Sequence, residues 1–449
     1  MAKGRRAAVA NTAGSRRGKV SDMQICVVAL GKIGLPLAVQ FASKGHRVIG
    51  ADVDERVVEL VNAGTEPFPG EASLDMLLKD VVERGLLSAT TDTAAAVAAS
   101  DAVVVVVPLF VDAQGAPDFG WLDDATRSIA AGLRRGTLVS YETTLPVGTT
   151  RDRWAPLLQE RSGLTPGRDF ALVFSPERVL TGRVFADLRR YPKLVGGIDE
   201  ESARQGVAFY ESVLDFDSRE DLPRPNGVWD LGGAEAAELA KLAETTYRDV
   251  NIGLANQFAR YAQTLNVDIT AVIEACNTQP YSHIHQPGIA VGGHCIPVYP
   301  RLYLWNDPAA TVVSSAREAN AAMPEYAVDL LAAAYGDLAG ASVLVLGAAY
   351  RGGVKETAFS GVFPTVAALM ARGATTYVSD PMYSAGELAD LSLTPHEGQV
   401  VDAAVVQADH AEYRALGVRD LPAVRVLVDG RRITDPALWP GVRRILIGG

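Results

Sequence analysis

Cysteine is scarce in this chain, and its scarcity argues against two kinds of protein. The 449 residues include only Cys26, Cys276 and Cys295. Three cysteines are too few for a disulfide framework, and none stands in a Cys/His spacing typical of zinc sites. Runs of about 18 apolar residues, the length that spans a bilayer, are also missing. We therefore predict a reduced, cytoplasmic protein without a metal and without a membrane partner.

Positive charge is in deficit, because 42 Lys and Arg face 53 Asp and Glu, for a net charge of −11. A net acidic protein is a poor candidate for nucleic-acid binding. The hydrophobic share of 48% and the charged share of 21% are typical of a globular chain. Residues 1–19 are the exception, with six basic residues and no acidic ones. They lack the apolar core of a secretory signal, so residues 1–22 are predicted to be a disordered basic tail.

Continuous apolar segments of strand length, separated by helix-length segments, dominate the first half of the chain. Strands without alternation, interleaved with helices, indicate a parallel sheet that is covered on both faces. We therefore predict a doubly wound domain over residues 23–215. The predicted strands are residues 24–30, 47–51, 102–107, 137–140, 170–174 and 193–196.

The second half of the chain begins with linker chemistry, since residues 215–233 are rich in charge, proline and glycine. From residue 234 to about 265 there is no proline, and apolar residues recur at three- and four-residue spacing, which predicts a long helix that bridges domains or pairs with a second copy. The strand–glycine–helix order restarts at residues 341–347, and residues 376–380 resemble a second strand that ends in an acid. The predicted fold class is α/β, with two Rossmann-like domains (23–215 and 331–449) joined by a helical region (216–330).

A glycine fingerprint follows the first predicted strand at residues 29–34 (ALGKIG), with alanine in place of its first glycine. Gly31 and Gly34 stand where the backbone must approach a pyrophosphate and where the helix must pack on the strand. Asp52 ends the next strand, where its carboxylate would bind an adenosine ribose and would favour NAD over NADP. Glycine can also serve the turn alone, but motif, strands and acid together predict NAD. The candidate cofactor contacts here are Gly31, Lys32, Ile33, Gly34 and Asp52.

The most informative stretch is residues 287–297 (PGIAVGGHCIP). Cys26 and Cys276 are interpreted as small buried hydrophobic residues. Cys295 differs, because Gly292 and Gly293 would let substrate approach the backbone and Pro297 would begin a helix whose positive end favours a thiolate. A nucleophilic thiol beside a dinucleotide site suggests oxidation through a covalent thiohemiacetal and a thioester.

The chain resembles the UDP-glucose/GDP-mannose dehydrogenases, and within them the bacterial UDP-N-acetylmannosamine 6-dehydrogenase type. The resemblance runs from about residue 23 to the C-terminus. It implies an NAD domain, a dimerising helix region and a C-terminal nucleotide-sugar domain, with two hydride transfers to NAD that convert a C6 alcohol into a carboxylate. It rests on the cysteine loop and on residues 143–150, 175–178, 192–197, 237–251 and 347–351.

The same resemblance assigns roles to single residues. Cys295 falls on the nucleophile, Lys241 on the lysine that stabilises the C6 oxyanion, and Thr144 on the threonine that orients water. Glu177 falls on the carboxylate that helps to hydrolyse the thioester, although a helix cap or an ion pair is the alternative for it. Pro108 and Thr144 are further candidate cofactor contacts. The candidate substrate contacts are Glu177, Arg178, Lys193 (near the phosphates, or else a surface lysine), Lys241, Gly292, Gly293, Tyr299, Arg351 and Lys355.

Four positions depart from the family pattern. The helix asparagine one turn after the lysine is Thr245, counted here as catalytic because its hydroxyl can donate to an alkoxide. The aspartate four residues after the cysteine is Tyr299, a poor base with an unperturbed pKa of about 10. An arginine that reaches into the partner's site corresponds to Tyr281. An arginine after the second glycine loop corresponds to Ala358, and Lys355 and Arg351 are candidates to replace its charge.

The favoured reading is an NAD-dependent UDP-sugar 6-dehydrogenase acting on a UDP-N-acetylhexosamine such as UDP-ManNAc. The uronic acid formed would feed polysaccharide or related biosynthesis, and the chain is expected to form a homodimer through the long helix. Two alternatives stay open at this point. One is a variant that stops at the 6-aldehyde because Tyr299 and Thr245 slow hydrolysis, and the other is a nucleotide-sugar-binding paralogue without turnover.

Overall fold

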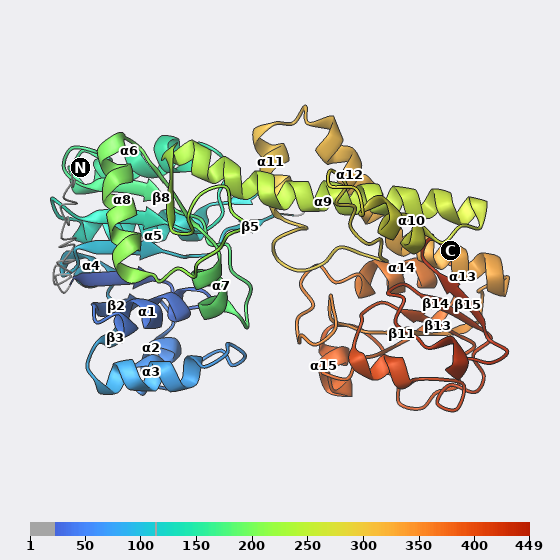
Figure 1. Cartoon of the computed structure of the whole chain (residues 1–449). Coiled ribbons are helices and arrows are strands. Elements are labelled where there is room, and N and C mark those ends of the chain that lie inside the picture. Colours follow the sequence, from blue (N-terminus) through green and yellow to red (C-terminus); the bar gives the residue numbers. More distant parts are fainter. Residues whose placement is uncertain (1–22, 113–114) are drawn as a thin grey trace, which may run out of the picture. The chain divides into compact units, whose positions relative to one another are not determined.

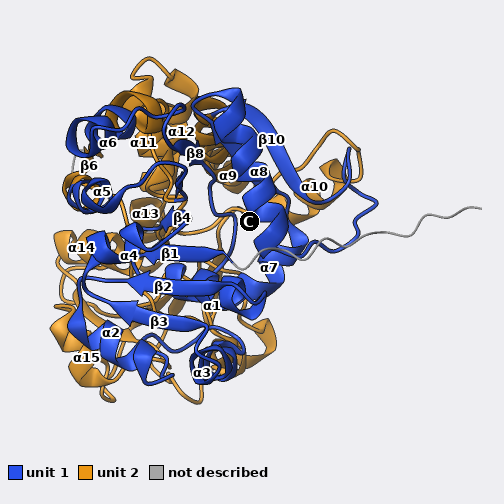
Figure 2. Cartoon of the chain, turned by 90° about the vertical axis from the view of Figure 1, so that its left-hand side faces the viewer, with its two compact units in different colours: residues 1–107, 124–142, 154–233 blue, residues 108–123, 143–153, 234–449 orange. Residues whose placement is uncertain are grey.

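The computed structural model describes residues 23–112 and 115–449, so the basic tail expected over residues 1–22 lies outside the described residues. Contacts between Cα atoms divide the chain into two compact units, shown in two colours in Figure 2. Unit 1 takes residues 1–107, 124–142 and 154–233, and unit 2 takes residues 108–123, 143–153 and 234–449. The segment that carries Thr144 therefore belongs to the same unit as Cys295.

Unit 1 is built on an eight-stranded sheet with the order β10-β9-β8-β7-β4-β1-β2-β3, of which β2, β3 and β8 are labelled in Figure 1. Its central strands are buried along their whole length, which is why their sequences do not alternate. All neighbours pair in parallel except β8 and β9, which pair antiparallel, so the prediction of a wholly parallel sheet is wrong at this one position. The strands are β1 (Gln24–Val28), β2 (Arg47–Ala51), β3 (Leu87–Thr90), β4 (Ala102–Val105), β7 (Leu138–Tyr141), β8 (Ala171–Phe174), β9 (Lys193–Gly197) and β10 (Val228–Gly233).

Helices of unit 1 pack on this sheet, with α8 against β8, β9 and β10 and with α1 against β1 and β2. Strand β10 falls inside the stretch interpreted as a linker, because it is a half-exposed edge strand without a continuous apolar run. The helices are α1 (Gly34–Ser43), α2 (Glu55–Asn62), α3 (Leu74–Glu83), α4 (Thr93–Ala98), α5 (Gly120–Gly132, which begins in unit 2), α6 (Ala155–Ser162), α7 (Val184–Arg190) and α8 (Glu200–Val213).

Unit 2 contains the long helix α9 (Ala234–Leu265), whose 32 residues match the predicted span. One face of α9 is buried against α11 (Tyr299–Asn306) and α12 (Thr311–Ala321), and Gly253 lets the backbone of α12 approach closely, since a Cβ there would lie 3.0 Å from the carbonyl oxygen of Ala316. The other face exposes large apolar side chains. They are Leu239, Tyr247, Leu254, Phe258, Tyr261 and Leu265.

The rest of unit 2 is a second α/β domain around a five-stranded, wholly parallel sheet with the order β12-β11-β13-β14-β15. A short hairpin of β5 (Phe110–Val111) and β6 (Pro117–Asp118) also belongs to this unit. The predicted α/β fold with two sheets and a long helix is thus confirmed. The remaining elements are α10 (Ile269–Cys276), α13 (Met323–Tyr335), β11 (Ser342–Leu346), α14 (Val362–Ala371), β12 (Thr375–Ser379), α15 (Ala385–Asp390), β13 (Ala403–Val406), β14 (Val426–Asp429) and β15 (Arg443–Leu446), with short helical turns at Thr150–Trp154, Ala411–Ala415 and Pro436–Leu438.

The structure also bears on two predictions from the sequence, the lack of a membrane span and the state of the cysteines. Among the described residues, no helix combines the length and the apolar composition needed to cross a bilayer. All three cysteines are free thiols, and Cys26 is buried as expected. Cys276 is exposed, so its interpretation as a buried residue is wrong. It is the last residue of α10, where the helix ends in an exposed turn.

Candidate active site

The glycine loop of unit 1 forms a tight turn between β1 and α1. Ala29, which stands in place of the first fingerprint glycine, has φ = 75°, in the left-handed region that costs an L-residue roughly 1 kcal/mol. A Cβ on Gly34 would collide with the carbonyl oxygen of Ala29, so the third position requires glycine for helix packing. A Cβ on Gly31 would meet no atom within 4 Å, which leaves room for a ligand to approach the backbone at the start of α1.

Asp52 follows β2 and holds this turn from the adjacent strand. Its Oδ2 accepts the Leu30 N–H at 2.7 Å, and its Oδ1 accepts the Asp54 N–H at 3.0 Å. Each carboxylate oxygen keeps a second lone pair, which can accept a ribose hydroxyl. The open backbone at Gly31, the helix terminus and this carboxylate therefore fit the NAD that the sequence predicts. Lys32 and Pro108 are exposed, and Ile33 is half-buried.

Lys193 is the centre of a buried polar cluster in unit 1. Its ammonium contacts Glu142 Oε2 at 2.8 Å and also contacts Glu177 Oε1. The Tyr210 hydroxyl donates to Glu142 Oε1 at 2.5 Å. Burial raises the pKa of Glu142 well above its usual range, against the opposing pull of Lys193. Burial alone would lower the pKa of Lys193, but the two carboxylates outweigh it and keep the lysine charged.

The surroundings of Lys193 and Arg178 bear on their predicted roles as substrate contacts. The Lys193 side chain is only 5% exposed and is held by two carboxylates, which favours a role in positioning Glu177 over the expected phosphate contact or surface lysine. Arg178 donates to the carbonyl oxygen of Pro192 at 3.3 Å, and its guanidinium lies 5.9 Å from the centre of the Tyr191 ring. Both contacts link the segment that carries Glu177 to the two residues directly before β9.

In unit 2, the loop of Cys295 packs on the second glycine loop. A Cβ on Gly292 would lie 2.5 Å from Tyr350 Cβ, and Gly293 has φ = 91° and donates its N–H to the carbonyl oxygen of Ala358 at 2.8 Å. Packing and backbone conformation therefore require glycine at both positions, and the approach of substrate to their backbone stays a prediction.

Cys295 itself is exposed and lies in the turn that leads into α11. Its carbonyl oxygen accepts the N–H groups of Val298 at 3.2 Å and Tyr299 at 2.9 Å. The helix begins at Tyr299 with Pro300 in its first turn, so the expectation that Pro297 starts the helix is wrong by two residues.

Tyr299 joins three of the predicted residues within unit 2. Its backbone N–H donates to the Cys295 carbonyl oxygen, and its phenol, whose pKa burial raises, lies near the side chains of Cys295 and Thr144. The Lys241 ammonium lies 5.8 Å from the centre of the Tyr299 ring, and Lys241 is 8% exposed on the buried face of α9. The structure therefore brings together the sulfur, a hydroxyl and a buried cation that the sequence places in three separate segments.

Thr245 lies one turn after Lys241 on α9, but its hydroxyl is directed to its own helix. It donates to the carbonyl oxygens of Lys241 at 3.0 Å and Leu242 at 3.1 Å. Such back-bonding is common for threonine within helices. In this rotamer the hydroxyl hydrogen is not available to an alkoxide, so the donor role expected for Thr245 requires a change of rotamer.

Glu238, also on the buried face of α9, anchors the loop that carries Thr144. Its carboxylate accepts the N–H groups of Gly148 at 2.6 Å and Thr150 at 2.9 Å and the Thr150 hydroxyl at 2.7 Å. Burial raises the pKa of Glu238 to about 7, although these hydrogen bonds favour the ionised form. The loop is therefore fixed to α9 through one buried carboxylate.

The two candidate cations near the second glycine loop, Lys355 and Arg351, contact neighbouring protein groups. Lys355 pairs with Glu387 on the surface, and Arg351 donates to its neighbours Tyr350 and Gly352. Arg301 also lies near Ala358, the position where the family pattern has an arginine, since its guanidinium is 5.8 Å from the centre of the ring of the adjacent Phe359. It lines a cavity of about 490 Å³ in unit 2 together with Gly115, Ala116, Leu304, Trp305, Arg317, Glu318 and Ala321.

Comparison with known proteins assigns a family to this arrangement. Residues 23–214 match the NAD binding domain of the UDP-glucose/GDP-mannose dehydrogenase family, residues 235–322 its central domain, and residues 344–436 its UDP binding domain. The chain belongs to this family. It is accordingly an NAD-dependent oxidoreductase, and unit 1 carries its NAD-binding domain.

Individual relatives cover nearly the whole chain. A UDP-N-acetyl-D-mannosamine dehydrogenase of Pyrococcus horikoshii is 36% identical over 421 residues, which are 92% of this chain and 96% of the relative. An NDP-N-acetyl-D-galactosaminuronic acid dehydrogenase of Ralstonia nicotianae is 31% identical and covers 91% and 95%. The solved structure of a UDP-D-ManNAc dehydrogenase from Pyrococcus horikoshii superposes with a TM-score of 0.83 at 33% identity, covering 95% of this chain and 99% of that one.

Sequence reasoning missed three polar residues around the site. Glu142 stands directly before the threonine motif, and Glu238 stands inside the long-helix motif. A charged residue in or beside a family motif and among apolar neighbours could have marked both. Arg301 gave no such signal, because two residues of sequence separation from Tyr299 do not show that its side chain reaches the neighbourhood of Ala358.

Proposed function

We propose that this chain is a UDP-sugar 6-dehydrogenase that oxidises the C6 alcohol of a UDP-N-acetylhexosamine to the uronate in two steps. The observation that supports it most is the set of contacts around Cys295 in unit 2. Tyr299 donates its backbone N–H to the Cys295 carbonyl oxygen at 2.9 Å, its phenol lies near Thr144, and its ring centre lies 5.8 Å from the buried ammonium of Lys241. A nucleophile, a hydroxyl that can hold water and an oxyanion-stabilising cation are the groups that a thioester route needs.

In the first step the alcohol becomes an aldehyde: its O–H proton passes to solvent along waters held by Thr144, and Lys241 stabilises the negative charge on the C6 oxygen while the C6 hydride leaves. NAD, when bound, accepts the hydride of each oxidation. In the second step the Cys295 thiolate attacks C6, a C–S bond forms, and the carbonyl electron pair moves to oxygen beside Lys241. Loss of the second hydride from this thiohemiacetal leaves a thioester on Cys295.

Hydrolysis then completes the reaction. Water positioned by Thr144 attacks the thioester carbon, and Glu177 accepts a proton from that water. The C–S bond breaks, its electron pair returns to sulfur, and the carboxylate is released. Lys193 and Glu142 hold the Glu177 carboxylate in place for this step.

The proposed substrate class rests on the relatives, which are named for N-acetylated mannosamine and galactosaminuronic acid nucleotides. Arg351 and Lys355 are kept as proposed substrate contacts, together with Gly292 and Gly293 through their backbone. A panel of UDP-glucose, UDP-GlcNAc, UDP-GalNAc, UDP-ManNAc and GDP-mannose, followed by absorbance at 340 nm, tests the proposal. We expect two NADH per sugar with a UDP-N-acetylhexosamine, and no NADH with any sugar would overturn it.

One observation favours a second candidate, a variant that stops at the 6-aldehyde. The Thr245 hydroxyl donates to carbonyl oxygens of its own helix. Tyr299, which has no carboxylate, stands where the family pattern has an aspartate. Slow hydrolysis would then release one NADH per sugar. The same NADH count therefore separates the two candidates.

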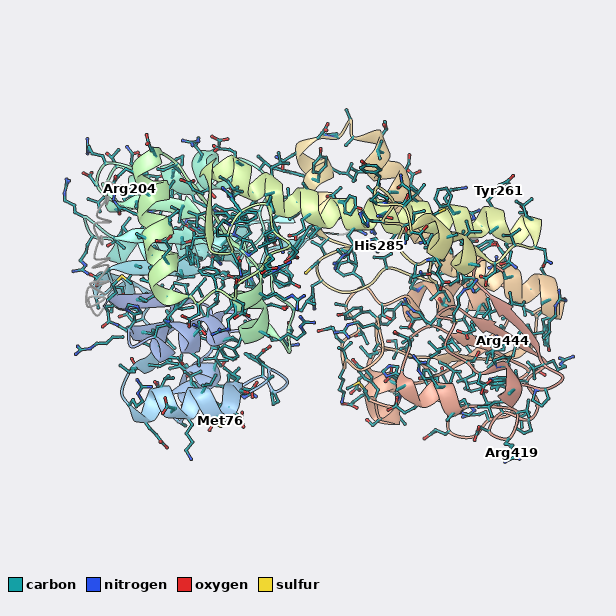
Figure 3. The ribbon with its side chains drawn as sticks, in the orientation of Figure 1. Met76, Arg204, Tyr261, His285, Arg419 and Arg444 are labelled. Carbon is teal, nitrogen blue, oxygen red and sulfur yellow. The ribbon has the colours of Figure 1, made fainter. Side chains whose placement is uncertain are left out.

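We also propose that the chain forms a homodimer through α9. Leu254, Phe258, Tyr261 and Leu265 recur at three- and four-residue spacing on its exposed face. Figure 3 shows Tyr261 projecting outward from this helix. An apolar stripe of this kind on a helix typically meets a partner surface. The cytoplasm stays the proposed location, because all three thiols are free.

A further inference from the structure

The cavity of about 490 Å³ in unit 2 is formed by three segments of that unit. Arg301 and Trp305 come from α11, Arg317 and Glu318 from α12, and Gly115 from the loop between β5 and β6. Sites for small molecules typically have volumes of about 300–1,000 Å³. The cavity is therefore in the size range of a ligand site.

Arg301 is the cation in this cavity that a ligand would find available. Among residues 23–112 and 115–449, no carboxylate forms an ion pair with its guanidinium, whose neighbour is the ring of Phe359. Burial, followed by the charge of Arg317, lowers the pKa of Arg301. Arg317 itself is already paired, since its Nη1 lies 2.8 Å from Asp249 Oδ1. An anionic ligand would supply the counter-charge that Arg301 lacks.

Two neighbours restrict the position of the Arg301 side chain. Gly115 has φ = 88°, and a Cβ added there would lie 3.1 Å from Arg301 Cδ, so the loop of the hairpin packs on the stem of the arginine. Phe359 has φ = 50°, a left-handed conformation that is rare for an L-residue and is often found at ligand sites. A side chain that is held before the ligand arrives loses less entropy on binding.

The chemistry of the walls favours a phosphate-bearing ligand. A planar guanidinium can donate two parallel hydrogen bonds to a phosphate. NAD, the cofactor of this family, and UDP, the ligand of its third domain, both carry a diphosphate. Trp305 is 49% exposed and adds an aromatic surface on which a base or a ribose can pack.

We propose that this cavity binds the diphosphate of a nucleotide, with Arg301 as the cation that contacts it. The inference rests on the proposed function only in taking a UDP-sugar as one of two sources of the diphosphate, the other being NAD. Glu318 also lines the cavity and opposes an anion, but it is exposed to solvent and accepts the Ser314 hydroxyl at 3.4 Å, so water screens its charge. Arg301 is a binding residue, and it takes no part in proton or hydride transfer.

Calorimetric titration of the full chain tests the proposal with two probes, NAD and UDP, each measured separately. Arg301→Met keeps most of the stem and removes the charge. Given the strength of hydrogen bonds to charged groups, we expect its affinity for one probe to fall about ten- to hundredfold and its affinity for the other to stay the same. A loss for NAD assigns the cavity to the dinucleotide, and a loss for UDP assigns it to the nucleotide-sugar.

Arg419→Met is the matched control, because it removes an exposed cation elsewhere in unit 2 (Figure 3) and should change neither affinity. Unchanged affinity of Arg301→Met for both probes would overturn the inference. An equal loss for both probes would also overturn it, since such a loss indicates a general disturbance of the fold.

Arg301→Lys is the second variant, should Arg301→Met not fold. It keeps the charge but lacks the planar fork of the guanidinium, so we expect a smaller loss for one probe only, and unchanged affinity for both contradicts the account. Neither titration needs turnover. If the variants behave as expected but the parent reduces no NAD with any sugar, the proposed function fails while the assignment of the cavity stands.

Discussion

The ammonium of Lys193 lies 2.8 Å from the carboxylate of Glu142 in the interior of unit 1. Glu142 is fully buried and also accepts the Tyr210 hydroxyl. Removing one member of a buried ion pair leaves the other unpaired or forces it to take up a proton, as the raised pKa of Glu142 allows, and the loss typically costs about 3–5 kcal/mol. We expect Lys193→Met to lower the stability of unit 1 by this amount, measured as faster hydrogen exchange in β7, β8 and β9.

The matched control for this prediction is the double variant Lys193→Met/Glu142→Gln. It removes one of the two carboxylates that the lysine balanced, so part of the lost protection should return. If the double variant is as unstable as the single variant, the cost does not come from unpaired buried charge, and the role assigned to Lys193 fails.

Ala29 carries a conformational cost that a glycine would not. Its φ of 75° is in the left-handed region. Ala29→Gly should therefore stabilise the chain by about 1 kcal/mol, less the added entropy of the unfolded glycine. The control is Ala99→Gly at the end of α4, where φ is −89° and no strain is relieved. Thermal unfolding should rank Ala29→Gly above the parent and Ala99→Gly at or below it, and the reverse order contradicts the reading.

Glu238 predicts a pH-dependent contribution to stability. Its pKa is raised by burial from 4.5 to about 7 in the folded chain. The folded state thus holds its proton longer than the unfolded state, so this contribution is fully present below pH 4.5 and is lost as the pH rises toward 7, by up to about 3 kcal/mol. Glu238→Gln cannot titrate, so its stability relative to the parent should improve between pH 5 and pH 8 in urea unfolding. A constant difference across that range would contradict the prediction.

The exposed face of α9 predicts a change of assembly on substitution. Tyr261 is 63% exposed on the stripe proposed to pair with a second copy. Tyr261→Glu should shift the chain from dimer toward monomer in sedimentation velocity, because a buried unpaired charge opposes association. Met76, 66% exposed on α3 of unit 1 and labelled in Figure 3, is the control, and Met76→Glu should leave the assembly unchanged.

Local pattern was enough to place much of the fold. The parallel strand β2 and the long helix α9 carry their signal in consecutive residues, so their bounds follow from the sequence. The antiparallel β8–β9 pair and the edge strand β10 do not, because strand direction and sheet order depend on how distant segments meet.

The candidate site shows the same limit at the level of side chains. Residue type and motif identify Cys295, Lys241 and Thr144, but the destination of a hydroxyl or an ammonium is a tertiary property. The sequence alone therefore could not show that Thr245 bonds to its own helix, that Lys193 is balanced by two carboxylates, or that Tyr299 contacts the cysteine.

The central claim is that Cys295 carries the sugar as a thioester, and its replacement by serine tests this most directly. Acid formation from the active UDP-N-acetylhexosamine is measured by chromatography, alongside NAD affinity as a check on unit 1. The account predicts that Cys295→Ser forms no detectable uronate while its NAD affinity equals that of the parent. Uronate formed at the parental rate would contradict the account.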